Sequence, residues 1–162
     1  MEVKVLMCHD GENGNPDVKA KMPTYGSEHA AGADLYCMQN LVLKPFMPTL
    51  VKTGLKMQIP EGTELQIRPR SGTALSDGLW VLNSPGTIDE DYRGEIGVIL
   101  CWTGADTTLN KFNIIDGCLY IPAGSRIAQA VLSPVIHADY VEVTDLNETA
   151  RGEGGFGSSG VN

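Results

Sequence analysis

The arginines and the lysines of this 162-residue sequence are distributed differently, and one segment groups two arginines with residues that could bind an anion. The segment Arg68-Pro69-Arg70-Ser71-Gly72 sets two arginines, a hydroxyl and a conformationally permissive glycine between an expected strand and an expected short helix. A guanidinium group binds phosphate or carboxylate through two parallel hydrogen bonds. The pattern therefore favours a phosphate cradle. A tight turn in which Ser71 is the helix N-cap explains the same residues.

A second candidate lies in the segment from Gly86 to Gly94, which is rich in carboxylates. Asp89, Glu90 and Asp91 stand together, and Tyr92 and Arg93 follow them between two apolar stretches. We expect a hairpin with this charged sequence at its tip. Crowded carboxylates need a compensating cation, and one of them could orient a water molecule as a general base. The alternative is a solvated acidic turn that is paired with Arg93.

The sequence from Arg151 to Gly160 is rich in glycine but includes Arg151, Phe156, Ser158 and Ser159. We expect no helix after it, so a P-loop is not indicated. A mobile arm that closes over a ligand would use these residues: arginine and serines for phosphate, phenylalanine to stack on a ring, and glycines such as Gly157 for close backbone approach.

Short alternating segments between glycine and proline turns are the elements that must position these residues. The clearest segment runs from Val51 to Ile59, where every second residue is apolar from Leu55 onward and the lysines fall on the other face. The only helix we expect is a short turn at Thr73–Ser76. Further strands are predicted at Val3–Met7, Leu41–Leu43, Glu64–Arg68, Leu79–Leu82, Glu95–Trp102, Phe112–Ile115, Cys118–Ile121, Ile127–Leu132 and Tyr140–Val143. The pattern predicts an all-β fold.

Composition excludes several classes of function. A formal net charge of -8 has the wrong sign for stable nucleic-acid binding, and no apolar run is long enough to span a membrane. No signal peptide is apparent, so we expect a cytoplasmic protein. The four scattered cysteines and three histidines have no metal-ligand spacing, and we interpret the cysteines as ordinary reduced thiols.

Five short motifs, in order along nearly the whole chain, resemble those of the trimeric dUTP pyrophosphatases, the dUTPase family. They are Ala31-Gly32-Ala33-Asp34-Leu35, then Pro69-Arg70-Ser71-Gly72, then Leu82 to Asp89 continuing into Asp91-Tyr92-Arg93-Gly94, then Arg126-Ile127-Ala128-Gln129, and finally Arg151-Gly152 with Gly154 to Ser158. Each pattern is weak alone, whereas five in sequence are specific.

The resemblance implies an all-β, jelly-roll-like β-clip barrel over residues 1–150 and a mobile glycine-rich arm over residues 151–162. It also implies a homotrimer whose active sites are shared between subunits. The implied reaction is hydrolysis of dUTP to dUMP and pyrophosphate with Mg²⁺, which supplies dUMP for thymidylate synthesis and limits uracil incorporation into DNA.

The resemblance also implies a role for each candidate residue. Asp89 would be the general base and Gln129 would hold the attacking water or the α-phosphate. Asp34 would contact the magnesium ion through water. The phosphate chain would be bound by Arg70, Ser71 and Gly72 on one side and by Arg151, Gly157, Ser158 and Ser159 of the arm on another, with Phe156 over the ring. Asn83, Thr87, Ile88, Tyr92 and Gly97 would select the base and the deoxyribose.

Two other functions remain open at this point. A dCTP deaminase shares this fold, although such deaminases usually carry Trp-Glu-Gly where this chain has Tyr92-Arg93-Gly94. A regulatory protein that responds to dUTP is the second alternative. The loop Gly11–Asp17 and the extra residues Thr103–Cys118 depart from the usual family pattern and are where a protein partner would dock.

Overall fold

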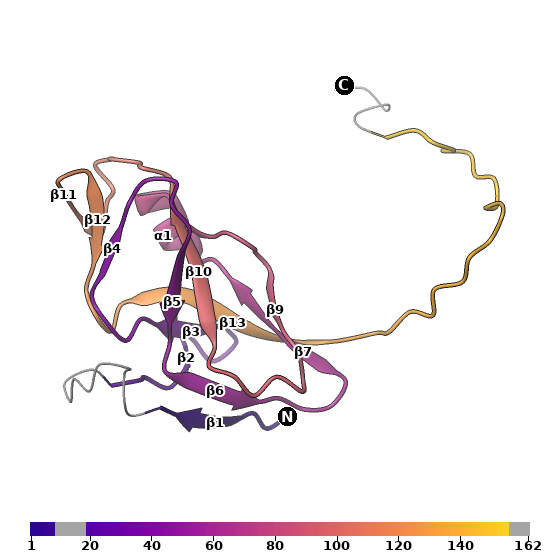
Figure 1. Cartoon of the computed structure of the whole chain (residues 1–162), viewed down its shortest axis with the longest axis horizontal. Helices are drawn as coiled ribbons and strands as arrows, with labels where there is room; N and C mark the ends of the chain where they lie inside the picture. Colours follow the sequence, from indigo (N-terminus) through magenta and orange to yellow (C-terminus); the bar gives the residue numbers. More distant parts are fainter. Residues whose placement is uncertain (9–18, 156–162) are drawn as a thin grey trace.

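The computed structural model describes residues 1–8 and 19–155. In the described residues the chain forms short β-strands and one helix (Figure 1). The elements are β1 (Lys4–Met7), β2 (Thr24–Tyr25), β3 (Ala33–Tyr36), β4 (Leu41–Leu43), β5 (Thr49–Lys52), β6 (Leu55–Gln58), β7 (Thr63–Arg68), α1 (Ser71–Asp77), β8 (Leu79–Val81), β9 (Gly86–Ile88), β10 (Gly97–Trp102), β11 (Asn113–Ile115), β12 (Cys118–Ile121) and β13 (Arg126–Pro134).

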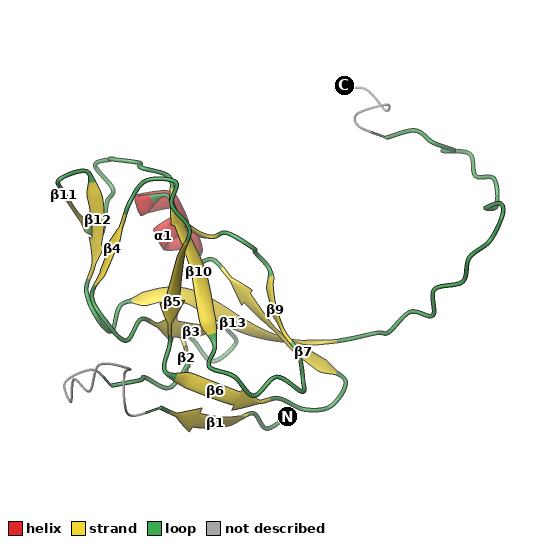
Figure 2. Cartoon of the chain, in the orientation of Figure 1, coloured by secondary structure: helices red, strands yellow, loops and turns green. Residues whose placement is uncertain are grey.

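The strands form antiparallel sheets (Figure 2). The largest sheet has the order β2-β3-β13-β7-β9, and two three-stranded sheets have the orders β5-β10-β8 and β11-β12-β4. Strand β1 pairs with β6. Apolar side chains from all of these sheets are buried together, among them Leu35, Leu43, Val51, Leu55, Ile67, Val81, Val98, Leu100, Leu119 and Ile127. The predicted all-β fold is confirmed.

Most predicted strands are confirmed, two of them, β4 and β12, with the same bounds. The single strand predicted from Val51 to Ile59 is wrong, because the chain breaks at Gly54 into β5 and β6. Gly54 has φ of +71°, and a Cβ atom there would lie 2.2 Å from the Met38 sulfur. The alternation continues through the break because Val51 and Leu55 both face the core.

The hairpin predicted around Gly86–Gly94 is also wrong. Strand β9 pairs with β7, whereas β10 pairs with β5 and β8, so the two strands belong to different sheets. The charged segment is therefore a crossover between sheets. Apolar strands flanking a polar turn are typical of a hairpin, but they do not identify the sheet in which each strand pairs.

The predicted helix is confirmed and extends over Ser71–Asp77. Arg70 is its N-cap residue and Ser71 is its first residue, so the alternative in which Ser71 caps the helix is wrong. Gly78 ends the helix in the left-handed conformation at φ of 62°.

After β13 the chain leaves the barrel as an extended segment (Figure 1). The strand predicted at Tyr140–Val143 is absent: among residues 1–8 and 19–155 no strand lies beside this segment to supply hydrogen bonds. Large apolar side chains along the segment are exposed: Ile136, Tyr140, Val141, Val143 and Leu146. The domain division at residue 150 stays a prediction.

Within residues 1–8 and 19–155, no helix has the length and apolar character that crossing a membrane requires.

Candidate active site

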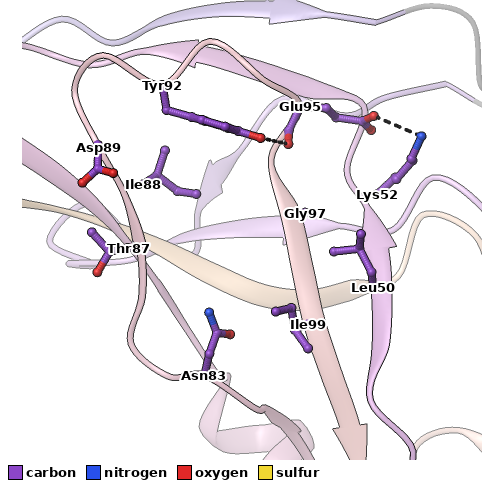
Figure 3. Close-up of a pocket in the computed structure, with 10 residues that line it drawn as sticks. All are labelled: Leu50, Lys52, Asn83, Thr87, Ile88, Asp89, Tyr92, Glu95, Gly97 and Ile99. Carbon is purple, nitrogen blue, oxygen red and sulfur yellow. Dashed lines mark hydrogen bonds and ion pairs between the residues drawn. The ribbon is translucent and has the colours of Figure 1, made fainter.

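A pocket of about 590 Å³ lies between the β5–β10 sheet and the crossover that follows β9 (Figure 3). One wall comes from strand register: Gly97 pairs with Lys52, and Ile99 pairs with Leu50. Paired residues in a sheet point to the same face, so these four side-chain positions face the pocket while Val51 and Val98 face the core. Because Gly97 has no side chain, the Leu50 side chain can lie directly against the β10 backbone. A Cβ atom at Gly97 would lie 2.7 Å from Leu50 Cδ1.

The opposite wall is formed by Asn83, Thr87, Ile88, Asp89 and Tyr92 (Figure 3). Asn83 packs against Gly86, where a Cβ atom would lie 3.2 Å from the Asn83 amide nitrogen. The wall therefore combines an amide, a hydroxyl, a carboxylate and an aromatic ring with the apolar side chain of Ile88. That combination suits a small planar polar ligand.

Hydrogen bonds to the main chain fix the crossover that carries Asp89. The Tyr92 hydroxyl donates to the Glu95 carbonyl at 3.0 Å, and its ring lies so close to Gly94 that a Cβ there would be 2.3 Å from the hydroxyl oxygen. The Arg93 guanidinium donates to the carbonyls of Glu90 and Tyr92 at 2.6 and 2.9 Å. Arg93 is thus paired with this exposed acidic turn, as the alternative expected, but through main-chain carbonyls and not through the carboxylates.

The Asp89 carboxylate has no hydrogen-bond or ion-pair partner among residues 1–8 and 19–155. Its neighbour Glu90 instead accepts the Gly62 N–H at 2.5 Å. Asp89 is exposed at the edge of the pocket on a fixed loop. It can accept a proton from a ligand or from water.

The charged residues at the other edge of the pocket neutralise each other. Lys52 Nζ lies 3.8 Å from Glu95 Oε2, and Glu95 Oε1 accepts the Gly54 N–H at 2.8 Å (Figure 3). Because the charges of Lys52 and Glu95 balance each other, the pocket does not require a charged ligand on that side.

A second group of candidate residues lies on the polar face of the five-stranded sheet. The Asp34 carboxylate on β3 accepts from Arg70 Nε at 2.6 Å and from Arg126 at 3.2 Å. The Asp34 side chain is 11% exposed and that of Arg126 is 53% exposed. One carboxylate thus holds two guanidinium groups, which leaves a net positive charge here for an anion.

Gln129 occupies the position opposite Asp34 in the β13–β3 register. Its amide nitrogen donates to the Pro69 carbonyl at 2.8 Å. Its amide oxygen lies over Gly32, where a Cβ atom would be 2.3 Å away. Gly32 therefore makes room for Gln129 beside the segment that carries Arg70.

The side chains at this site suit a magnesium ion only if most of its ligands come from a bound substrate and from water. The described residues contain no group of three or more His, Cys, Asp or Glu side chains that could hold a metal. Mg²⁺ usually keeps several waters and uses one or two carboxylates together with substrate phosphates. Asp34 fits such a role through water, because both of its oxygens are already bonded to arginine.

All four cysteines are free. Burial raises the pKa of the Cys37 thiol, which donates to the Pro122 carbonyl at 3.3 Å. A buried thiol of this kind is a packing residue.

The structure separates the predicted site residues into two groups. The pocket group contains Asn83, Thr87, Ile88, Asp89, Tyr92 and Gly97. The second group is an arginine cluster that contains Asp34, Arg70, Ser71, Gly72 and Gln129, and it does not line that pocket. Arg151 is exposed on the extended segment and donates to the Gly154 carbonyl at 2.7 Å. Phe156, Gly157, Ser158 and Ser159 lie outside the described residues, as does the loop Gly11–Asp17.

Four pocket residues were missed by sequence reasoning: Leu50, Lys52, Glu95 and Ile99. Two of them stand on β5, and only its register with β10 brings them to the pocket. Alternation could have assigned them to the solvent side of their strands, but it does not reveal which strand pairs with which.

The fold and the site define an all-β protein with a pocket of mixed polar and apolar lining and a separate arginine cluster. Comparison with known proteins makes this specific. The family model described as dUTPase matches residues 18–160, and the chain belongs to the dUTPase family of enzymes.

Curated relatives agree with this assignment. The deoxyuridine 5'-triphosphate nucleotidohydrolase of Wolinella succinogenes is 48% identical over 160 residues, which are 99% of this chain and 95% of the relative. The enzyme of the same name from a Picosynechococcus strain is 49% identical over 161 residues, 99% of this chain and 100% of the relative. The structure of the Staphylococcus bacteriophage 80alpha dUTPase with dUPNHPP is 27% identical, with a TM-score of 0.80 and 99% coverage of both chains.

The packing of Gln129 on Gly32 generates a prediction. Gly32→Ala places a methyl group where the Gln129 amide oxygen lies, and we expect dUTP turnover to fall about 10²-fold because the amide is displaced. Gly26→Ala is the matched control, since a Cβ atom at Gly26 meets nothing within 4 Å. Steady-state kinetics of both variants checks this. Equal activities would show that the position of Gln129 is unimportant.

Proposed function

We propose that this protein hydrolyses dUTP to dUMP and pyrophosphate, with Asp89 as the general base. The observation that carries the proposal is the Asp89 carboxylate, which has no partner in the described part of the chain and stands on a fixed loop at the edge of a pocket suited to a planar base. Membership of the dUTPase family supports the choice of substrate.

The pocket would bind the deoxyuridine part of the substrate. The Asn83 amide and main-chain groups between Ile88 and Gly97 offer the hydrogen bonds that a uracil edge needs. Tyr92, held by its hydroxyl on Glu95, would pack against the deoxyribose where a 2′-hydroxyl would clash. An extra methyl group on the base would meet the wall that Gly97 and Leu50 bring together.

The second group would bind the phosphates. Arg70, Ser71 and Gly72 would contact the phosphate chain, and Gln129 would hold the attacking water or an α-phosphate oxygen. Arg151, Gly157, Ser158 and Ser159 would close from another side, with Phe156 over the ring. Mg²⁺, when bound, would neutralise charge across the three phosphates, with Asp34 contacting its hydration shell.

In the chemical step Asp89 accepts a proton from a water molecule, and the water oxygen bonds to the α-phosphorus. The bond from the α-phosphorus to the oxygen bridging the α- and β-phosphates breaks in line with the attack, and pyrophosphate leaves with the electron pair. Arg70 and its neighbours stabilise the charge that develops on the phosphate oxygens.

The site would be completed between copies of this chain, in a homotrimer. The arginine cluster of Asp34, Arg70, Ser71, Gly72 and Gln129 does not line the pocket in which Asp89 stands, which supports this arrangement. The exposed apolar residues from Ile136 to Leu146 need another surface to cover them. A neighbouring copy of the chain would complete the site and would also cover these apolar residues.

A nucleotide panel tests the substrate assignment. With Mg²⁺ we expect pyrophosphate release from dUTP and strong discrimination against UTP, dTTP and dCTP, because the pocket has no room or partner for their extra groups. Release of ammonia from dCTP would instead indicate a deaminase. Comparable turnover of UTP or dCTP would contradict the proposal.

A second prediction concerns Asp89. Asp89→Asn keeps the shape of the side chain but removes the base, so kcat should fall about 10²–10⁴-fold while dUTP still binds. Asp91→Asn is the matched control, because Asp91 is an exposed carboxylate of the same turn that does not line the pocket. Turnover measurements and calorimetry with dUTP separate the two effects. Collapse of dUTP affinity with little change in kcat would assign Asp89 a different role.

A further inference from the structure

The loop between β10 and β11 is fastened to helix α1 by a buried carboxylate. Asp77 is fully buried, and its Oδ1 atom accepts the N–H groups of Lys111 at 2.7 Å and Phe112 at 3.0 Å. Thr107 adds a hydrogen bond from its hydroxyl to the Ser76 carbonyl at 3.1 Å. Loop and helix are therefore held in a fixed relation, although they are far apart in the sequence.

This attachment puts the ammonium group of Lys111 beside Gly72, in the first turn of α1. The Lys111 Nζ atom lies 3.1 Å from the position that a Cβ atom on Gly72 would take. Gly72 is the neighbour of Ser71 and follows Arg70 closely, so the ammonium group stands beside the segment proposed to bind phosphate. Glycine at this position lets the lysine approach the backbone.

The Lys111 ammonium group has no direct polar partner among the described residues. None of their hydrogen bonds or ion pairs involves the Lys111 side chain, and α1 has no acidic residue in its first turn. Lys21 shows what an internally satisfied lysine looks like in this fold. It also approaches a glycine, Gly124, but it donates to the Gly124 carbonyl at 3.2 Å and lies 5.2 Å from the centroid of the Tyr36 ring.

Lys111 and Arg70 are complementary in chemistry. Arg70 is fixed by Asp34 and offers a rigid planar fork, whereas Lys111 carries a compact charge on a flexible, exposed stem. A lysine of this kind binds phosphate as a point charge and can follow the ligand. Arg70 belongs to the segment that the Lys111 ammonium group approaches. The Arg70 charge is shared with the Asp34 carboxylate, whereas the Lys111 ammonium group has no hydrogen-bond or ion-pair partner among the described residues.

We propose that Lys111 is a further substrate-binding residue, which contacts the phosphate chain of the bound nucleotide alongside Gly72. The proposal rests on the proposed function, since it assumes that this segment receives a triphosphate. It gives the residues Thr103–Cys118 a role in substrate binding.

The test compares Lys111→Met, which keeps most of the stem and removes the charge, with Lys111→Arg, which keeps the charge. Lys4→Met is the matched control, because Lys4 is an exposed lysine on β1 and its loss changes the net charge equally. The readouts are KM and kcat for dUTP, the inhibition constant of deoxyuridine, and the Kd of inorganic tripolyphosphate by calorimetry. Thermal unfolding verifies that each variant is folded.

For Lys111→Met we expect KM for dUTP and Kd for tripolyphosphate to rise about tenfold, with kcat within about twofold and deoxyuridine inhibition unchanged. Lys111→Arg should recover most of the affinity. A merely structural role would also shift deoxyuridine inhibition or the unfolding temperature.

Equal KM and Kd values for Lys111→Met and Lys4→Met would overturn the inference while leaving dUTP hydrolysis intact. If the wild type does not hydrolyse dUTP, the proposed function fails, and the tripolyphosphate comparison still decides the role of Lys111. A wild type that binds neither dUTP nor tripolyphosphate would overturn both.

Discussion

The Asp34 carboxylate ties together three segments that are distant in the sequence: strand β3, the turn after β7, and the start of β13. It does so by accepting from Arg70 at 2.6 Å and from Arg126 at 3.2 Å. Without this carboxylate the two guanidinium groups would repel each other, and a partly buried charge without its partner is strongly unfavourable. The position of Arg70, and with it the proposed phosphate site, depends on this contact.

Close packing around glycine sets the remaining geometry. Gly32 receives the Gln129 amide, Gly94 receives the Tyr92 ring, and Gly97 brings β10 against Leu50. In each case the missing side chain lets a functional group or a pocket wall lie against the backbone. Gly32 and Gly94 belong to the family motifs, so these motifs supply the space that the Gln129 and Tyr92 side chains occupy as well as polar side chains.

The sequence predicted the all-β fold, the helix and most strands, because alternation and turn residues are local signals. It could not predict that β9 and β10 lie in different sheets, since strand pairing is a property of the whole chain. For the same reason Lys52 and Leu50 were missed in the pocket. The resemblance supplied Asp89, Asn83 and Tyr92, which the structure brings to one pocket, but the roles of these residues stay predictions.

The central claim is that a working site needs more than one copy of this chain, and mixed trimers test it most directly. A chain truncated after Ala150 keeps Asp89 but lacks the arm, whereas full-length Asp89→Asn keeps the arm but lacks the base. Each should be nearly inactive alone. Coexpression should restore dUTP turnover well above the sum of the two parents, because some sites then combine an intact base with an intact arm. Activity no greater than that sum, with mixed trimers confirmed by mass measurement, would contradict the shared site.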